Sequence, residues 1–205
     1  MKYLILKTNK ACPNRYAKRY RRGFTLVETL VAISIFSVSL MALMSVLANG
    51  IASTSYVKEK DTAIYLAQEG IEYMRNMRDT YVLYSSSPQA GWDAFKNKLT
   101  ENSCTGVNGC YFNADGLFTT ISSPMEMTKI SFGTCTSFGC SNAPMLYNSS
   151  TGKYGYTAGS ATNFIRKINV QVSTNETKIL STVYWTQGSG TYNLTLSENL
   201  FNWVE

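Results

Sequence analysis

The chain has 205 residues, enough for one domain with an appendage, and residues 1–23 carry eight of its nineteen Lys and Arg residues and no acidic residue. From residue 24 onward eleven basic residues face thirteen acidic ones, and this net charge of −2 argues against a nucleic-acid-binding surface, which would be basic. The chain has no histidine, the commonest general base and transition-metal ligand, so we predict neither a catalytic site nor a bound metal or cofactor.

An apolar run follows the basic segment. The basic segment ends at Gly23, and Phe24 begins about two dozen apolar or small residues that reach Ala48. As an α-helix this run would span the ~30 Å hydrocarbon core of a bilayer, since each residue adds about 1.5 Å. Lys and Arg flank the cytoplasmic side of a membrane segment, so we expect residues 1–23 to be cytoplasmic. The single acid, Glu28, would cost about 3 kcal/mol in the bilayer, which indicates a functional role.

The predicted helix continues beyond the apolar run. Between residues 57 and 81 a stripe recurs at three- and four-residue steps, which is typical of a helix with one buried face. The pattern stops at a Ser-rich segment before Pro88. We therefore predict one nearly unbroken helix from residue 24 to about residue 84, apolar all round in its first half and on one face in its second half. The stripe consists of Val57, Lys60, Ile64, Ala67, Ile71, Met74, Arg78 and Tyr81.

The rest of the chain is predicted to be β-rich. Residues 88–160 are rich in Gly, Ser and Asn, and we expect irregular structure there, with a hairpin turn at Asp115-Gly116 and a short strand over residues 128–132. Residues 163–203 alternate as an antiparallel meander of three strands.

The apolar face of this meander needs a cover, and the striped half of the helix is the obvious candidate. The fold class is therefore α+β, a long N-terminal helix packed on a small antiparallel sheet. The residues expected on the inner face are Phe164, Ile168, Val170 and Val172, with Arg166 as an exception, then Ile179, Val183 and Trp185, then Tyr192, Leu194 and Leu196.

The cysteines favour disulfide bonds. Cys104 and Cys110 form one close pair, Cys135 and Cys140 form another, and the fifth cysteine, Cys12, lies in the basic segment. An even set in an exported region is what a disulfide framework requires, and proximity favours local pairing, although loop-closure entropy does not decide it. A zinc site with four thiolates is an alternative, but the spacing from Cys104 to Cys110 is wider than is usual for zinc.

Residues 15–48 resemble the prepilin-type signal of type IV pilins and type II secretion pseudopilins. The match comprises the basic residues, Gly23, Phe24, Glu28 as the fifth residue after the glycine, and the apolar run. The resemblance implies that a prepilin peptidase cleaves after Gly23 and that the new amine of Phe24 is N-methylated. It also implies that Glu28 neutralises that amine on a neighbouring subunit during assembly, since a buried carboxylate needs a partner.

Two other interpretations of the apolar run fit these residues less well than the resemblance does. A simple single-pass membrane anchor leaves Glu28 and the Gly23–Phe24 junction unexplained. A secretory signal cleaved after Ala48 would have an overlong apolar region that contains an acid.

The resemblance implies four segments: a cytoplasmic leader (1–23), a transmembrane and filament-core half-helix (24–50), an amphipathic half-helix (51–87) and a β-rich head (88–205). Such a chain is a structural subunit rather than an enzyme. It would begin as a single-pass protein of the cytoplasmic membrane with its head outside, and then join a cell-surface or periplasmic filament. Its partners would be the prepilin peptidase, other pilin or pseudopilin subunits and the assembly platform.

The position of the cysteines bears on the type of subunit. They precede the final sheet, whereas in many major pilins a disulfide brackets a region near the C-terminus. We therefore favour a minor pilin or a pseudopilin. The alternatives are a pilus-tip module that binds DNA or surfaces, and a membrane-anchored extracellular domain.

Overall fold

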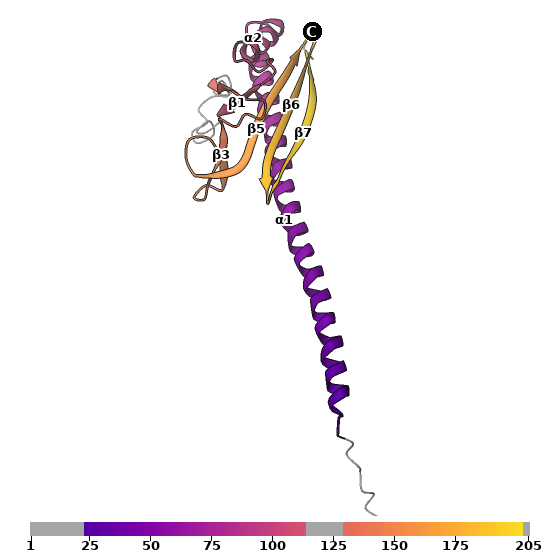
Figure 1. Ribbon diagram of the computed structural model, residues 1–205. Coiled ribbons are helices and arrows are strands. Elements are labelled where there is room, and N and C mark those ends of the chain that lie inside the picture. Colours follow the sequence, from indigo (N-terminus) through magenta and orange to yellow (C-terminus); the bar gives the residue numbers. More distant parts are fainter. Residues whose placement is uncertain (1–22, 114–128, 203–205) are drawn as a thin grey trace, which may run out of the picture. The chain divides into compact units, whose positions relative to one another are not determined.

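The computed structural model describes residues 23–113 and 129–202 (Figure 1). Two helices and seven strands form in these residues, and contacts divide the chain into two compact units, one ending at Gly50 and the other starting at Ile51. The predicted α+β class is confirmed, because a long N-terminal helix is followed by a small antiparallel sheet. The basic segment with Cys12 and the predicted turn at Asp115-Gly116 lie outside the described residues.

The long helix α1 runs over Leu26–Tyr84, 59 residues, close to the predicted range of 24 to 84. It passes through Gly50 without a break and stops at a run of three serines before Pro88. The absence of proline within it explains its continuity, since proline removes a helical hydrogen bond and clashes with the preceding turn.

The face of α1 that meets the sheet differs slightly from the predicted stripe. Ala67, Ile71 and Met74 are buried as expected, but Val57 is 51% exposed. Gly70 belongs to the buried face although it is not in the stripe: a Cβ added there would lie 2.5 Å from the hydroxyl oxygen of a serine on the sheet, so the sheet approaches the helix closely at this residue. The predicted stripe did not include this glycine. The buried residues that it missed are Ala63, Leu66, Gly70, Met77, Thr80 and Val82.

The three-stranded meander is present as predicted. It consists of β5 (Ser160–Val172), β6 (Glu176–Gln187) and β7 (Gly190–Phe201), which pair antiparallel in sequence order. Figure 1 shows these three strands side by side along the part of α1 that belongs to the second unit. The buried side chains of β5 and β6 agree with the predicted inner face, except that Val172 is 38% exposed. The buried members are Phe164, Ile168, Val170, Ile179, Val183 and Trp185.

The region predicted to be irregular contains a second helix, so that prediction was wrong. Helix α2 spans Pro88–Glu101. Ser87 caps it, because the Ser87 hydroxyl oxygen accepts a hydrogen bond from the backbone N–H of Ala90 at 3.2 Å, and proline occupies the first helical position. Its three large buried side chains recur at helical spacing and enter the core beside α1. They are Trp92, Phe95 and Leu99.

Four short strands in the same region complete the sheet. β1 (Cys110–Asn113) pairs with β2 (Ser131–Thr134), which starts three residues and ends two residues later than the predicted strand at 128–132. β3 (Pro144–Asn148) pairs with β4 (Lys153–Gly155), a hairpin that was not predicted. Both β1 and β3 pair antiparallel with β5, which therefore lies at the centre of the sheet.

Arg166 lies on the inner face of β5, where it was expected to be an exception. Its side chain is 3% exposed, and its guanidinium donates to the Glu69 carboxylate at 2.7 Å and to the Leu66 carbonyl oxygen at 3.2 Å. The guanidinium also lies 4.4 Å from the centre of the Phe112 ring, a cation–π contact. The residue that breaks the apolar alternation therefore ties the sheet to α1.

This ion pair predicts an asymmetry between two substitutions. Glu69 is 39% exposed, so water can solvate its carboxylate if Arg166 is lost, whereas loss of Glu69 leaves a buried cation without its anion. We expect Glu69→Ala to lower the free energy of unfolding by about 3 kcal/mol and Arg166→Met by about 1 kcal/mol. Urea unfolding of both variants measures this difference, and a larger loss for Arg166→Met would contradict the explanation.

Candidate functional site

The Gly23–Phe24 junction lies just before the first residue of α1. Both residues are exposed and non-helical, and the Phe24 side chain is 79% exposed. A Cβ added at Gly23 would have no heavy atom of the described residues within 4 Å. The backbone on both sides of this bond is therefore open to an enzyme, which is what cleavage of the chain at this point requires.

Thr25 fixes the start of the helix immediately after the junction. Its hydroxyl oxygen accepts a hydrogen bond from the backbone N–H of Glu28 at 3.3 Å, and its carbonyl oxygen accepts one from the N–H of Thr29 at 3.2 Å. This is an N-cap, which satisfies a donor that the helix itself leaves unpaired. This role was not predicted, although Thr25-x-x-Glu28 is the residue pattern of a capping box.

Glu28 lies in the first turn of α1, where the helix dipole favours a negative charge. Its side chain is exposed, and among the described residues no cation lies within ion-pair distance of its carboxylate. The structure thus places Gly23, Phe24 and Glu28 within about one helical turn of one another along the chain. It also leaves the carboxylate available to a cation from elsewhere.

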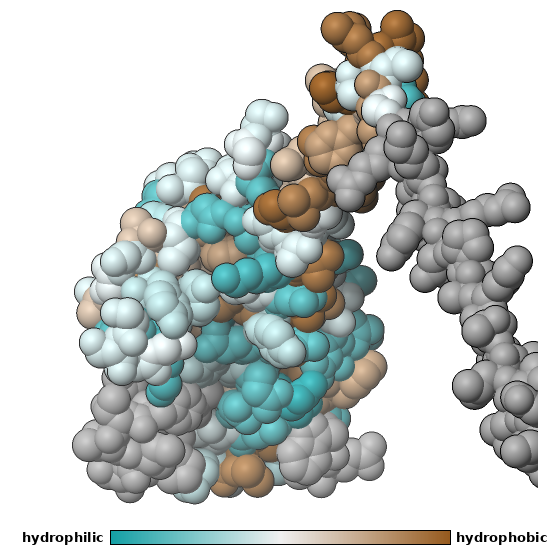
Figure 2. Space-filling view, turned by 90° about the horizontal axis from the view of Figure 1, so that it is seen from below, coloured by the Kyte–Doolittle hydropathy of each residue, from teal (hydrophilic) through white to brown (hydrophobic). Residues whose placement is uncertain are grey.

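The first half of α1 is apolar on all sides, and its large apolar side chains are exposed. No residue of its most apolar 18-residue window is buried, and α1 is the one described helix that is long and apolar enough to cross a membrane. Figure 2 shows brown, apolar side chains around this part of the helix, whereas the visible face of the head is mostly teal and white. The large exposed side chains are Phe24, Leu26, Val27, Leu30, Val31, Ile33, Ile35, Phe36, Val38, Leu40, Met41, Leu43, Met44, Val46, Leu47 and Ile51.

Three of the four serine hydroxyls in this segment are satisfied by the helix itself. Ser34, Ser37 and Ser39 each donate to the carbonyl oxygen four residues earlier at 2.8 Å. Such bonds make hydroxyls tolerable in lipid or against another apolar helix, because no polar atom is left without a partner. The only charged group in the apolar segment is therefore Glu28.

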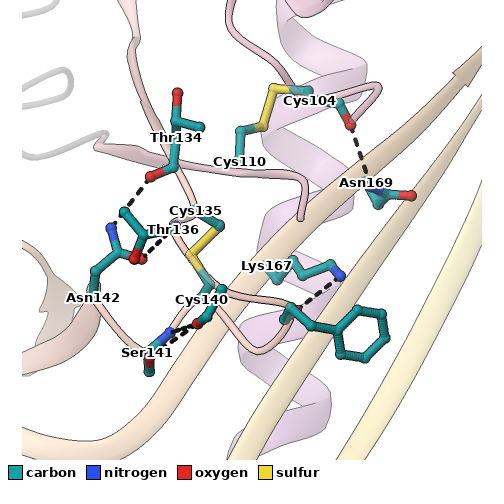
Figure 3. Close-up of a disulfide and its surroundings, with 12 residues drawn as sticks. Cys104, Cys110, Thr134, Cys135, Thr136, Cys140, Ser141, Asn142, Lys167 and Asn169 are labelled. Carbon is teal, nitrogen blue, oxygen red and sulfur yellow. Dashed lines mark hydrogen bonds between the residues drawn. A yellow bond between two sulfur atoms is a disulfide. The ribbon is translucent and has the colours of Figure 1, made fainter. Parts of the chain in front are cut away.

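The four cysteines of the head form two local disulfides, as proximity predicted (Figure 3). Cys104 pairs with Cys110, Cys135 pairs with Cys140, and all four residues are buried. Their sulfur atoms are thereby used, so the alternative of a zinc site with four thiolates does not apply to this structure. In the described part of the chain, no group of three or more potential metal-ligating side chains lies together.

Two side chains of β5 hold both disulfide loops to the sheet. The Lys167 ammonium donates to the Phe138 carbonyl oxygen at 2.9 Å, and the Asn169 amide donates to the Gly106 carbonyl oxygen at 2.7 Å (Figure 3 shows the Lys167 contact). Burial lowers the pKa of the Lys167 ammonium. Both contacts are structural, and no local sequence pattern predicts them because the loops and β5 lie far apart along the chain.

Comparison with known proteins agrees with the local geometry of the N-terminus. Residues 18–44 match the family model described as the prokaryotic N-terminal methylation motif. This match covers Gly23, Phe24, Glu28 and most of the apolar run, and the motif is the type IV prepilin signal. No curated protein and no solved structure matches the chain. The motif and the long apolar helix support a pilin-like or pseudopilin subunit that is anchored in a membrane.

Proposed function

We propose that this chain, which carries the type IV prepilin signal, is a minor pilin or a pseudopilin that is cleaved after Gly23, N-methylated at Phe24 and assembled through its apolar half-helix. The observation that carries the proposal is the accessible Gly23–Phe24 junction directly before a helix that is apolar all round. Cleavage at this junction retains the apolar helix, whereas a secretory peptidase would remove it.

The exposed apolar half-helix needs an environment other than water. Burying one large aliphatic or aromatic side chain is worth about 1.5–3 kcal/mol, and this segment carries many of them on every side. A bilayer supplies such an environment before assembly, and the matching half-helices of neighbouring subunits supply it afterwards. The same surface thus serves as the membrane anchor and then as the filament core.

In the proposed assembly, Glu28 determines how neighbouring subunits align. An uncompensated carboxylate in an apolar environment is costly, and no described residue of its own subunit lies in position to pair with it. The amine of Phe24 on a neighbouring subunit carries the opposite charge and enters the same apolar environment. Pairing the two groups would fix the register of adjacent helices.

The proposed organisation follows the segments expected from the sequence. Residues 1–23 form the cytoplasmic leader, residues 24–50 the membrane and filament-core segment, residues 51–87 the amphipathic half-helix, and residues 88–205 the β-rich head. The prepilin peptidase, other subunits and the assembly platform are the partners that each step needs. The disulfides precede the final meander, and this supports a minor subunit over the bulk subunit.

The abundance of the chain in sheared filaments tests the minor role. We expect quantitative immunoblots to find the processed chain in purified filaments at a small fraction of the bulk subunit, and deletion of its gene to reduce the number of filaments. Recovery in amounts equal to the bulk subunit would contradict a minor role. Loss of protein secretion without loss of surface pili would identify the filament as that of a type II secretion system.

A further inference from the structure

The head has a surface hollow between α1 and the β3–β4 hairpin. Its volume is about 540 Å³, within the range of small-molecule sites, and it lies entirely in the second unit. Nothing in the proposed assembly through the N-terminal helix uses it. The side chains that line it are Lys58, Thr62, Tyr65, Leu66, Tyr147 and Tyr154.

Three tyrosine rings dominate this hollow. Tyr65 is 71% exposed and Tyr147 is 39% exposed, so both present ring surface to the outside. The rings of Tyr147 and Tyr154 lie with their centres 5.0 Å apart, and Tyr154 also contacts Phe164 edge to face at 6.0 Å. The contact with Phe164 holds the Tyr154 ring to the core, while the rings of Tyr65 and Tyr147 form an exposed aromatic surface. Aromatic faces of this kind bind the flat C–H face of a ring-shaped ligand.

The polar groups around these rings include hydroxyls and one cation. A tyrosine hydroxyl is protonated at neutral pH, and burial raises the pKa of the Tyr154 hydroxyl further, so this group can both donate and accept a hydrogen bond. Lys58 is the only charged side chain in the lining. Among the described residues no carboxylate lies within 4.0 Å of its ammonium, so the positive charge is not neutralised by an ion pair.

We propose that this hollow binds an acidic saccharide, with a sugar ring against Tyr65 and Tyr147 and the carboxylate of the sugar near Lys58. A sugar acid combines an apolar ring face, several hydroxyls and one negative charge, which are the features that complement this lining.

Other ligand classes fit the hollow less well. A purely apolar ligand would find Leu66 as the only aliphatic side chain in the lining. An extended peptide would find little backbone to pair with, because the adjacent strand β4 has only three residues. A polynucleotide needs a track of cations along its backbone, and the lining offers one lysine.

Isothermal titration calorimetry of the full chain in detergent micelles tests the proposal. The probes are two acidic oligosaccharides, trigalacturonate and sialyllactose, with maltotriose as the neutral comparison. We expect at least one acidic probe to bind about tenfold or more tightly than maltotriose. Lys58→Gln should remove that preference, and Tyr65→Ala should weaken binding of the acidic probe about tenfold.

Two variants on the same helix serve as controls. Lys60→Gln removes a nearby lysine that does not line the hollow, and Tyr84→Ala removes a tyrosine that is 51% exposed elsewhere on α1. Both should bind as the unaltered chain does, and thermal unfolding checks that all four variants fold.

The proposal would be overturned if neither acidic probe bound, or if Lys60→Gln weakened binding of the acidic probe as much as Lys58→Gln does. The assay uses unassembled chains, so a negative result here leaves the proposed filament role standing, and failure of filament incorporation leaves this site standing.

Discussion

Replacement of Glu28 by alanine is expected to leave cleavage after Gly23 largely intact and to lower incorporation into filaments at least about tenfold. The carboxylate is exposed in the first turn of α1 and has no cationic partner among the described residues of its own chain. A neighbour's Phe24 amine would therefore lose its counter-charge in an apolar environment. A loss of about 1.4 kcal/mol per contact already corresponds to a factor of ten, and breaking a buried ion pair typically costs more.

Immunoblots of sheared filaments and of membranes measure this effect for processed chains. Glu28→Gln keeps the shape of the side chain and should behave like Glu28→Ala, because charge is the property required. Glu101→Ala, which removes an exposed acid at the end of α2, is the matched control and should assemble normally. Normal incorporation of both Glu28 variants would refute the charge-pairing account.

A bulky side chain at Gly23 is expected to abolish processing. The backbone at the junction is accessible, and a peptidase must bind it in an extended form, which a side chain such as leucine in Gly23→Leu would obstruct. The variant should accumulate with its leader, which carries eight cations, still attached to the apolar helix, and should remain in the membrane fraction. The mass of the intact chain measures whether the leader has been removed.

Gly50→Ala is the matched control for this variant. A Cβ added at either glycine meets no heavy atom within 4 Å, so neither substitution disturbs packing in the described chain. Gly50 lies inside α1, where alanine should stabilise the helix by about 0.5–1 kcal/mol and leave processing unchanged. Complete removal of the leader from Gly23→Leu would mean that the peptidase does not require glycine at this position.

The parts of the fold that follow from periodicity could be predicted from the sequence. α1 is long and uninterrupted by proline, and β5, β6 and β7 alternate with period two over twelve or thirteen residues each. In a long periodic segment many positions fit the same period, so one residue that departs from the pattern does not change the predicted element. The disulfide pairing was also predictable, because each pair is separated by only five or six positions along the chain.

The shorter elements could not be predicted in the same way. Strands of three to five residues, such as β1 and β4, offer too few positions for alternation, and their partners lie far along the chain. Helix α2 was missed for a different reason. The Gly, Ser and Asn content of residues 88–160 favours irregular structure, but Ser87-Pro88 is a helix start and the large apolar residues that follow have helical spacing.

Local features of the candidate site can be predicted from a single sequence, whereas contacts between distant residues or between subunits cannot. Gly23, Phe24 and Glu28 are predicted site residues because the motif is local and dense, and they lie within residues 18–44, which the family model matches; their roles stay a prediction. Arg166 was recognised as an anomaly, but its partner Glu69 lies 97 positions away and becomes evident only when the helix packs on the sheet. The proposed partner of Glu28 belongs to a second subunit, so no single chain contains it.

Mass spectrometry of the mature N-terminus tests the central claim most directly. The account predicts a chain that begins at Phe24 and has the mass of residues 24–205 plus one methyl group, with the methyl group on the amine of Phe24. A mature chain that begins at Met1, as a simple membrane anchor would, or at Asn49, as a secreted protein would, contradicts it.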